Sequence, residues 1–253
     1  MEYVVLSDLH LGNVRSDLES LEVLIKKVKD VVLGVRKLVV VGDLIDSTNL
    51  YELQKYLHLP KTMKIQKFLV RWFTDLVKEY VNPDEMIYVK GNHEDNVEGI
   101  DVDELLEGSG FKVYDLYYCE HYLDFLSMNS RKICFIHADQ RNVRGSKVVS
   151  ITPLKRIGEY VISDQLDCDV LVTGHIHKIL SIQKYGSRTF ITLPSFMLSK
   201  SVYEDVTFTP CIVVVESMER FTTLCRERKI NDLKNFEMRN LVKTSGIIRN
   251  YMK

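Results

Sequence analysis

Five of the seven histidines in this chain lie in short polar turns that directly follow runs of apolar, often β-branched residues. These turns, with one more that carries aspartates only, read Ser7-Asp8-Leu9-His10, Gly42-Asp43-Leu44-Ile45-Asp46, Gly91-Asn92-His93-Glu94, Ile136-His137-Ala138 and Gly174-His175-Ile176-His177. Short apolar runs of this kind are typical of buried strands. Because the carboxyl ends of strands in an open α/β sheet face one crevice, we expect the five turns to meet in space.

The first half of the chain alternates strand-like runs with stretches of helical period, which is typical of βαβ units. Ser16 and Glu19 have capping-box spacing and predict the start of the first helix. We expect strands at Tyr3–Leu6, Lys37–Val41 and Met86–Val89, and helices at Asp17–Val32, Leu50–Leu57 and, after a break at Pro60, Ile65–Tyr80.

The second half is richer in strands, and its pattern favours antiparallel pairing over βαβ units. We expect strands at Tyr122–Met128, Lys132–Ile136, Val170–Thr173, Ile179–Lys184, Thr189–Leu193 and Cys211–Val215, with a helix at Leu154–Leu166. Residues 1–216 therefore form one predicted α/β domain with two β-rich halves.

Residues 217–253 form a predicted helical extension of basic character, because nine basic residues face only four acidic ones there. Such a segment is usually a solvated helix resting on its domain. Two alternatives remain open, a contact in a homo-oligomer and an arm that binds a polyanion.

The bulk composition excludes little. The 34 basic and 35 acidic residues nearly cancel, so net charge neither supports nor excludes a nucleic-acid partner. The most apolar stretch, Val31–Val41, is interrupted by charges and falls short of the roughly 20 residues that a membrane span needs. Five widely spaced cysteines and a start unlike a secretory signal predict reduced thiols and a cytoplasmic protein.

The polar turns carry side chains that bind metal ions. In extended chain, residues i and i+2 point the same way, so Asp8 and His10 can aim at one region, as can His175 and His177. Imidazole, carboxylate and amide ligands together suit Mn, Fe, Co, Ni or Zn and suit Mg or Ca poorly. The ligands are too many for one ion, so two divalent ions are predicted.

Each turn taken alone has an ordinary structural interpretation. The Gly-Asp-x-x-Asp turn is also what a tight turn followed by a helix N-cap looks like, and a single histidine after a strand is commonly a hydrogen-bonded loop residue. Gly-Asn-His-Glu and Gly-His-x-His are rarer. All five turns in this order, each after a strand, favour a metal site.

In these five turns the chain resembles the calcineurin-like metallophosphoesterase superfamily. The resemblance implies a four-layer α-β-β-α sandwich of two mixed sheets, and two metal ions, with manganese expected first. It assigns Asp8, His10 and His177 to one ion, Asn92, His137 and His175 to the other, and Asp43 to both. It also implies a metal-bridging hydroxide as nucleophile, and a catalytic pair in which Glu94 orients His93, the proton donor. Asp46 is expected to support a ligand or cap a helix.

Two positions depart from the family pattern. Ala138 stands where a glycine is usual, and Glu94 stands where many members have aspartate. In the phosphoprotein phosphatases a glycine follows the first turn and an arginine follows the second. Here Leu11 and Ser47 stand at those positions, so that class is disfavoured.

The substrate is not fixed by these motifs. Asn13, Arg15, Arg141 and Arg144 are the predicted substrate-binding residues, because arginines grip phosphate groups bidentately, although they are equally well read as surface residues. The leading prediction is a phosphodiesterase, phosphomonoesterase or pyrophosphatase acting on a phosphorylated small molecule or nucleotide. A nuclease acting on DNA or RNA is the alternative that the basic tail supports. A non-catalytic metal-binding scaffold is disfavoured, since all seven ligand positions are filled.

Overall fold

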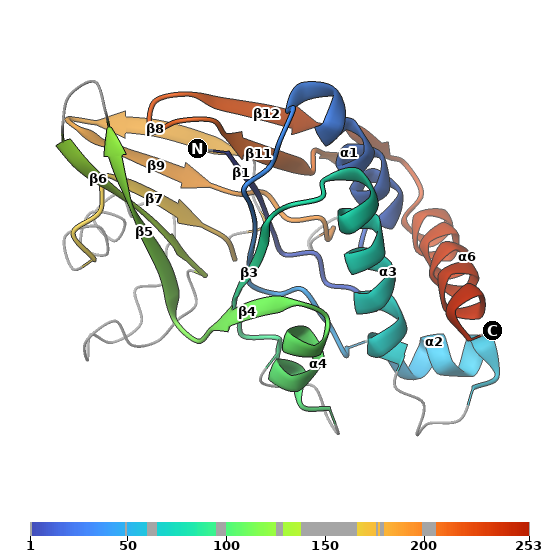
Figure 1. The fold of residues 1–253 in the computed structure, drawn as a ribbon. Coiled ribbons are helices and arrows are strands. Elements are labelled where there is room, and N and C mark those ends of the chain that lie inside the picture. The colour runs from blue at the N-terminus through green and yellow to red at the C-terminus, as the bar shows by residue number, and fades with distance from the viewer. Residues whose placement is uncertain are drawn as a thin grey trace.

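The computed structural model describes residues 2–48, 50–59, 65–94, 100–124, 129–137, 166–175, 177, 180–198 and 206–252. Two mixed β-sheets pack against each other, and helices cover the outer face of the larger sheet (Figure 1). This arrangement confirms the predicted α/β fold with two mixed sheets. The helix expected at Leu154–Leu166 lies outside the described residues except for its last residue.

The larger sheet has six strands in the order β12-β11-β1-β2-β3-β4. Four of them run parallel, namely β1 (Tyr3–Ser7), β2 (Lys37–Val41), β3 (Glu85–Val89) and β4 (Phe111–Tyr114). On the other side of β1 lies β11 (Cys211–Val215), which runs antiparallel to it. The edge strand β12 (Phe221–Cys225) runs antiparallel to β11. The carboxyl ends of β1, β2 and β3 therefore lie at one edge of the sheet.

The smaller sheet has five strands in the order β5-β6-β7-β9-β8. They are β5 (Tyr117–Asp124), β6 (Asn129–Ile136), β7 (Val170–Thr173), β8 (Ser181–Tyr185) and β9 (Arg188–Thr192). The expected antiparallel pairing is confirmed for β5 with β6 and for β8 with β9. It is wrong for β7, which runs parallel to both β6 and β9. A short antiparallel pair, β10 (Val206–Phe208) with β13 (Arg228–Ile230), stands apart from both sheets.

Alternation along the strands builds two cores. Tyr3, Val5 and Val39 point to the second sheet and pack with residues such as Phe135 and Val172. The alternate residues of the same strands, such as Val4 and Leu38, point the other way and pack with the helices. Because both faces of these strands are buried, the strands read as continuous apolar runs rather than as alternating ones.

The helices lie mainly over the larger sheet. They are α1 (Leu18–Val31), α2 (Leu50–Leu57), α3 (Ile65–Tyr80), α4 (Val102–Gly108) and α6 (Leu233–Tyr251). Helix α4 was not predicted from the sequence. The N-cap of α1 is Asp17, whose side chain accepts a hydrogen bond from Ser20 N, and not the expected Ser16. Ser16 is unavailable because its hydroxyl donates to the Leu9 carbonyl oxygen at 2.5 Å.

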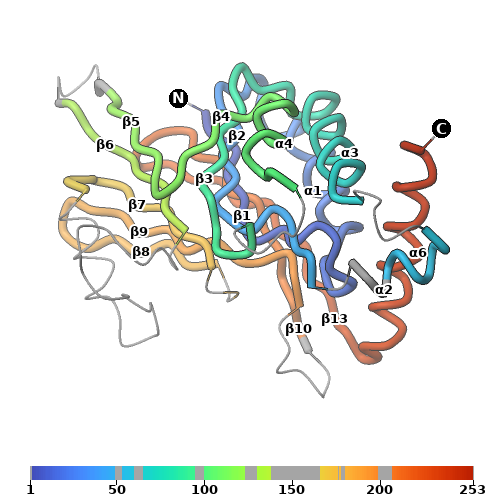
Figure 2. Tube along the Cα trace, turned by 90° about the horizontal axis from the view of Figure 1, so that it is seen from below, coloured from blue at the N-terminus to red at the C-terminus, as the bar shows by residue number. Residues whose placement is uncertain are grey.

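The C-terminal region differs from the predicted helical extension. Residues 221–225 form β12 at the edge of the larger sheet, and residues 228–230 form β13. Only α6 is helical, and it runs beside α2 and α3 in both views (Figure 2). Helix α6 packs on α1, α2 and α3 of its own domain, and the contact in a homo-oligomer and the polyanion-binding arm stay open.

Four of the five cysteines form disulfides, so the expectation of reduced thiols is wrong for them. Cys119 and Cys134 face each other across β5 and β6, and Cys211 and Cys225 across β11 and β12. Cys168 is buried and free. The predicted cytoplasmic location loses the support that reduced thiols gave it, because disulfides are rare in most reducing compartments. Within the described part of the chain, no helix is both long and apolar enough to cross a bilayer.

Candidate active site

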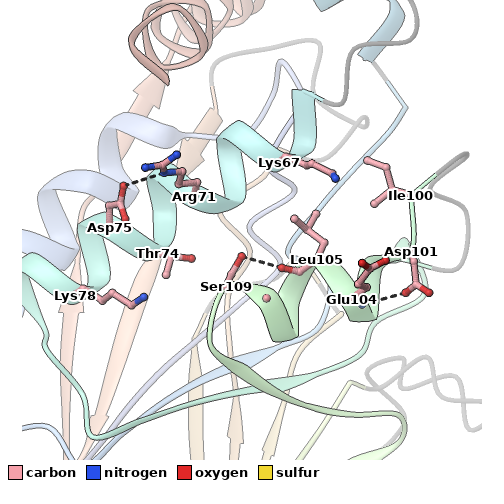
Figure 3. Close-up of a pocket in the computed structure, with 11 residues that line it drawn as sticks. Lys67, Arg71, Thr74, Asp75, Lys78, Ile100, Asp101, Glu104, Leu105 and Ser109 are labelled. Atoms are coloured by element: carbon pink, nitrogen blue, oxygen red, sulfur yellow. Dashed lines mark hydrogen bonds and ion pairs between the residues drawn. The ribbon is translucent and has the colours of Figure 1, made fainter. Parts of the chain in front are cut away.

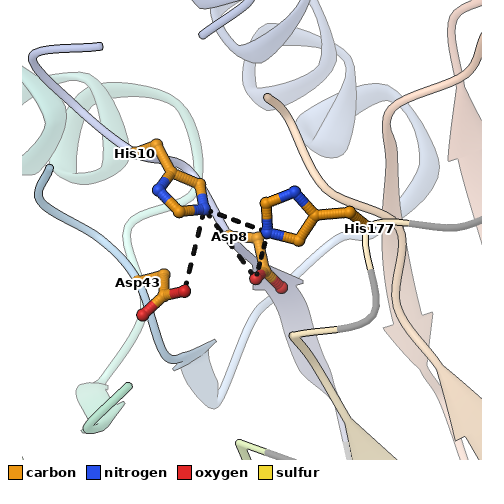
Figure 4. A group of neighbouring side chains, drawn as sticks. All are labelled: Asp8, His10, Asp43 and His177. Atoms are coloured by element: carbon orange, nitrogen blue, oxygen red, sulfur yellow. Dashed lines mark hydrogen bonds and ion pairs between the residues drawn. The ribbon is translucent and has the colours of Figure 1, made fainter. Parts of the chain in front are cut away.

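The five polar turns meet at the carboxyl ends of strands from both sheets. Three turns follow β1, β2 and β3 of the larger sheet, and two follow β6 and β7 of the smaller one. Figure 4 draws four side chains from three of these turns, with Asp8, His10, Asp43 and His177 directed at one another. Residues that are up to 169 positions apart in sequence thus share one site.

The backbone at this site is held in a conformation that most residues avoid. Five non-glycine residues of the turns have φ between 48° and 76°, namely Asp8, His10, Asp43, His175 and His177. This left-handed region costs a non-glycine residue about 1–3 kcal/mol and persists only where the surroundings impose it. Their concentration in the polar turns is a structural sign of function that the sequence alone did not reveal.

Two glycines let the turns approach each other closely. A Cβ atom on Gly42, whose φ is +76°, would overlap the His137 ring. A Cβ atom on Gly91 would overlap the Asp43 carboxylate. The glycines that open the second and third turns are therefore required by the packing of two predicted metal ligands.

A first group of side chains brings two carboxylates and two imidazoles together. His177 Nε2 lies 3.1 Å from Asp8 Oδ1 and 3.1 Å from His10 Nε2, while His10 Nε2 lies 3.7 Å from Asp43 Oδ2. Asp8 and His10 are fully buried, whereas the His177 side chain is 18% exposed. One ligand atom from each of the four residues lies within 4.8 Å of the other three.

A second group shares Asp43 with the first and adds His137 and His175. His137 Nε2 lies 3.4 Å from Asp43 Oδ2 and 3.4 Å from Asp8 Oδ1. Asn92 belongs to the same turn as His93, whose backbone N donates to Asp43 Oδ1 at 3.1 Å. All seven predicted ligands therefore come from turns that contact one another.

The chemistry of these groups fits divalent cations. Among the described residues, the ion-pair partners of the buried Asp8 and Asp43 carboxylates are histidines. Within the same part of the chain, His137 Nδ1 is buried without a hydrogen-bond partner. Burial alone would raise the pKa of Asp8, but hydrogen bonds from His137 and His177 hold that pKa well below its usual range. Burial likewise lowers the pKa of His137, but Asp43 and Asp8 raise it to about 10. The negative charge of the buried carboxylates thus needs a positive partner, which bound cations would supply.

Asp46 connects a predicted ligand with the predicted proton donor. Its Oδ2 atom lies 3.2 Å from His10 Nδ1 and 3.5 Å from His93 Nδ1, and its Oδ1 atom accepts from Thr48 N at 2.7 Å. With Nδ1 held in this way, His10 directs Nε2 to the carboxylates. The His93 side chain is 32% exposed, whereas that of His10 is fully buried. Asp46 raises the pKa of His93 by hydrogen bonding, against the lowering effect of burial.

The described hydrogen bonds of the Glu94 carboxylate run to two backbone amides, so they give no support to the prediction that Glu94 orients His93. The Glu94 carboxylate accepts hydrogen bonds from Ile45 N at 3.1 Å and Gly91 N at 3.0 Å, and it is buried between those turns. Burial and the nearby Asp43 carboxylate raise the pKa of Glu94. Glu94 thus joins the second turn to the third, while Asp46 takes the place beside His93.

The predicted substrate-binding residues have other partners or lie outside the described residues. Asn13 is buried, donates through Nδ2 to Asp46 Oδ2 at 2.9 Å, and accepts through Oδ1 from Arg15 N at 2.9 Å. Arg15 Nε donates to Glu237 of α6 at 2.7 Å. Arg141 and Arg144 lie outside the described residues. Asn13 and Arg15 are therefore engaged in supporting the first turn.

A separate groove of about 570 Å³ lies between α3 and α4 (Figure 3). Its walls carry cations of α3, such as Lys67 and Arg71, and acids near the start of α4, such as Asp101 and Glu104. None of its lining residues is a predicted ligand or a partner of one. We do not place the reaction there.

Solved structures with a similar fold share little sequence with this chain. A putative 5′-nucleotidase from Staphylococcus aureus is 12% identical, with 97% of this chain and 58% of that chain covered and a TM-score of 0.51. A single mutant of Vps29 from Entamoeba histolytica is 16% identical, with 91% of this chain and 100% of that chain covered and a TM-score of 0.49. No curated protein matches the sequence.

The family model described as calcineurin-like phosphoesterase matches residues 1–179, which span all five turns. Members of this family are metal-dependent hydrolases of phosphate esters. On the strength of this match, and of the turns that the fold brings together, the chain belongs to the calcineurin-like phosphoesterase family.

Proposed function

We propose that this phosphoesterase works with two divalent cations held side by side. Asp8, His10 and His177 bind one cation, Asn92, His137 and His175 bind the other, and Asp43 contacts both. The observation that carries this proposal is that Asp43 belongs to two separate groups of potential ligand atoms. Imidazole-rich sites of this kind favour Mn²⁺ or the similar ions of Fe, Co, Ni and Zn.

Two bound cations would lower the pKa of a water molecule and neutralise the charge of the phosphoryl oxygens. The protein contributes the geometry. Asp46 fixes the His10 ring, and Glu94 holds the second turn against the third. His93 faces the open side of the site and donates a proton to the leaving-group oxygen, a step that typically contributes 10²–10⁴-fold.

The preferred substrate is a phosphorylated small molecule or a nucleotide, cleaved at a phosphodiester, phosphomonoester or pyrophosphate bond. A nuclease is the second candidate, and its support was the basic C-terminal segment. That support is weaker than the composition indicated, because three of these cations pair with acids at the start of α1. The pairs are Arg226 with Glu19, Arg228 with Asp17 and Glu19, and Lys243 with Glu22. A non-catalytic scaffold remains the third candidate.

The test is a substrate panel under one metal. Hydrolysis of bis-p-nitrophenyl phosphate, p-nitrophenyl phosphate, a nucleoside diphosphate and single- and double-stranded DNA is measured with Mn²⁺. We expect turnover of small esters or pyrophosphates that exceeds any cleavage of DNA. Preferential cleavage of DNA would favour the nuclease, and bound metal without hydrolysis of any substrate would favour the scaffold.

A further inference from the structure

The loop after the first metal-binding turn is attached to the C-terminal helix by two contacts. Arg15 Nε donates to Glu237 Oε1 at 2.7 Å, and Asn240 Nδ2 donates to the Val14 carbonyl oxygen at 3.1 Å. Asn240 is buried, with 4% of its surface exposed, so its hydrogen bond to Val14 lies within the packed interior. Both contacts reach residues that lie four or five positions beyond His10.

The same loop reaches the centre of the site through Asn13. The Asn13 side chain accepts from Arg15 N at 2.9 Å and donates to Asp46 Oδ2 at 2.9 Å. The same Asp46 oxygen lies 3.2 Å from His10 Nδ1 and 3.5 Å from His93 Nδ1. A continuous series of contacts, through the side chains and backbone of the loop and through Asp46, therefore joins α6 to two histidines of the site.

We propose that Glu237 and Asn240 of α6 are positioning residues for His93, acting through the loop 13–15 and Asp46. Rings that lie on flexible single bonds need a fixed partner to remain in a productive orientation. Asp46 is that partner for His93, and Asn13 shares the Asp46 oxygen that His93 approaches. A shift of the loop changes where this oxygen points. The family model ends at residue 179, so α6 lies outside the matched residues.

The loop has a second support, which limits the size of the effect. Leu198 N donates to the Arg15 carbonyl oxygen at 3.1 Å, and Asp17 N donates to the Phe196 carbonyl oxygen at 2.8 Å. Loss of the α6 contacts therefore loosens the loop without releasing it. The expected consequence is a displaced His93 in a protein that is still folded and still binds metal.

The test variant is Glu237→Ala combined with Asn240→Ala, and the matched control is Lys243→Ala. Lys243 lies on the same helix, and its described ion pair is with Glu22 of α1 at 2.5 Å rather than with the loop. We expect the ¹⁵N signals of the His93 ring, assigned with His93→Gln, to move in the test variant and to stay in place in the control. Because Asn240 is buried, Glu237→Gln alone is the milder second variant and should move the same signals by less.

The kinetic readout compares bis-p-nitrophenyl phosphate with diphenyl phosphate, whose poorer leaving group depends more on a proton donor. In the test variant we expect kcat for diphenyl phosphate to fall about tenfold, with much smaller changes in KM and in the p-nitrophenyl reaction. Metal content should equal that of the wild type. Unmoved His93 signals, or equal movement in Lys243→Ala, would overturn the proposal.

This kinetic part relies on the proposed function, whereas the ring signals do not. If the wild type hydrolyses neither these diesters nor p-nitrophenyl phosphate nor a nucleoside diphosphate, the proposed function fails, while the His93 signals still decide whether α6 positions that ring. If the esters are hydrolysed and the signals do not move, only the positioning role of α6 fails.

Discussion

The Asp46 carboxylate lies 3.2 Å from His10 Nδ1 and so fixes the ring of a buried histidine that comes 36 residues earlier in the chain. The same oxygen lies 3.5 Å from the His93 ring. One carboxylate therefore governs the orientation of a proposed metal ligand and of the proposed proton donor.

Replacing Asp46 by asparagine should lower kcat about 10–100-fold, because partners of this kind orient ligands rather than hold the metal themselves. The amide keeps the size of the side chain but loses the charge that faces both rings. Steady-state kinetics with bis-p-nitrophenyl phosphate measures the change. Wild-type turnover in Asp46→Asn would show that neither ring depends on this carboxylate.

Replacing His93 by glutamine should reduce turnover roughly 10²–10⁴-fold while both metal ions stay bound. The reason is that His93 contacts Asp46 through its ring and the Asp43 carboxylate through its backbone, and the ring lies on the open side of the site. Metal content is measured alongside kcat. A variant that loses metal would assign His93 to metal binding instead of proton transfer.

The sequence predicted the local elements better than their assembly. The strands Lys37–Val41, Val170–Thr173 and Cys211–Val215 are confirmed as predicted, because each apolar run ends before a glycine or a charged residue. The helix Ile65–Tyr80 is confirmed because its apolar residues recur on one face. Strand β12 was missed, since its residues are half exposed and give a weak signal.

Contacts between distant parts of the chain could not be predicted from local sequence patterns. The parallel position of β7 between β6 and β9 depends on which strands pair, and local patterns do not encode that. Glu94 was expected beside His93, but Ile45 N, 49 residues earlier, offers its carboxylate a backbone donor. The metal-binding turns were easier to find, because each is a short local motif. The ligand roles of their residues stay predictions.

The disulfides give a prediction about the thiols. Under denaturing conditions without reductant, a thiol-alkylating reagent should modify one cysteine, Cys168, whereas after reduction it should modify all five. Strand register explains the pairing, since Cys119 lies opposite Cys134 and Cys211 opposite Cys225. Mass spectrometry counts the modified residues. Five modified cysteines before reduction would restore the original expectation of free thiols.

A charged cluster far from the metal-binding turns predicts how stability depends on pH. Glu120 lies 2.7 Å from Lys37 Nζ and accepts hydrogen bonds from Tyr3 and Tyr118 at 2.7 Å each. Burial raises the pKa of Glu120, but these three partners outweigh it and lower that pKa below its usual value. The resulting stability is present above the pKa of the unfolded chain, about 4.3, and is lost as pH falls through the folded pKa.

Glu120→Gln should therefore destabilise the protein near neutral pH and flatten the loss of stability on acidification. Urea unfolding at several values between roughly pH 3 and pH 7 measures both effects. Glu107→Gln, on an exposed position of α4, is the control and should follow the wild type. If Glu120→Gln and the wild type lose stability in parallel on acidification, the cluster does not act through this carboxylate.

The central claim is a pair of cations that share Asp43. The most direct measurement is the number of Mn²⁺ ions bound per chain in the wild type and in Asp43→Asn, determined by elemental analysis after equilibrium dialysis and paired with ester hydrolysis. We predict two ions per chain and Mn²⁺-dependent hydrolysis in the wild type, with weakened binding at both positions and loss of turnover in Asp43→Asn. One ion or none in the active wild-type protein, or full activity in Asp43→Asn, would contradict the account.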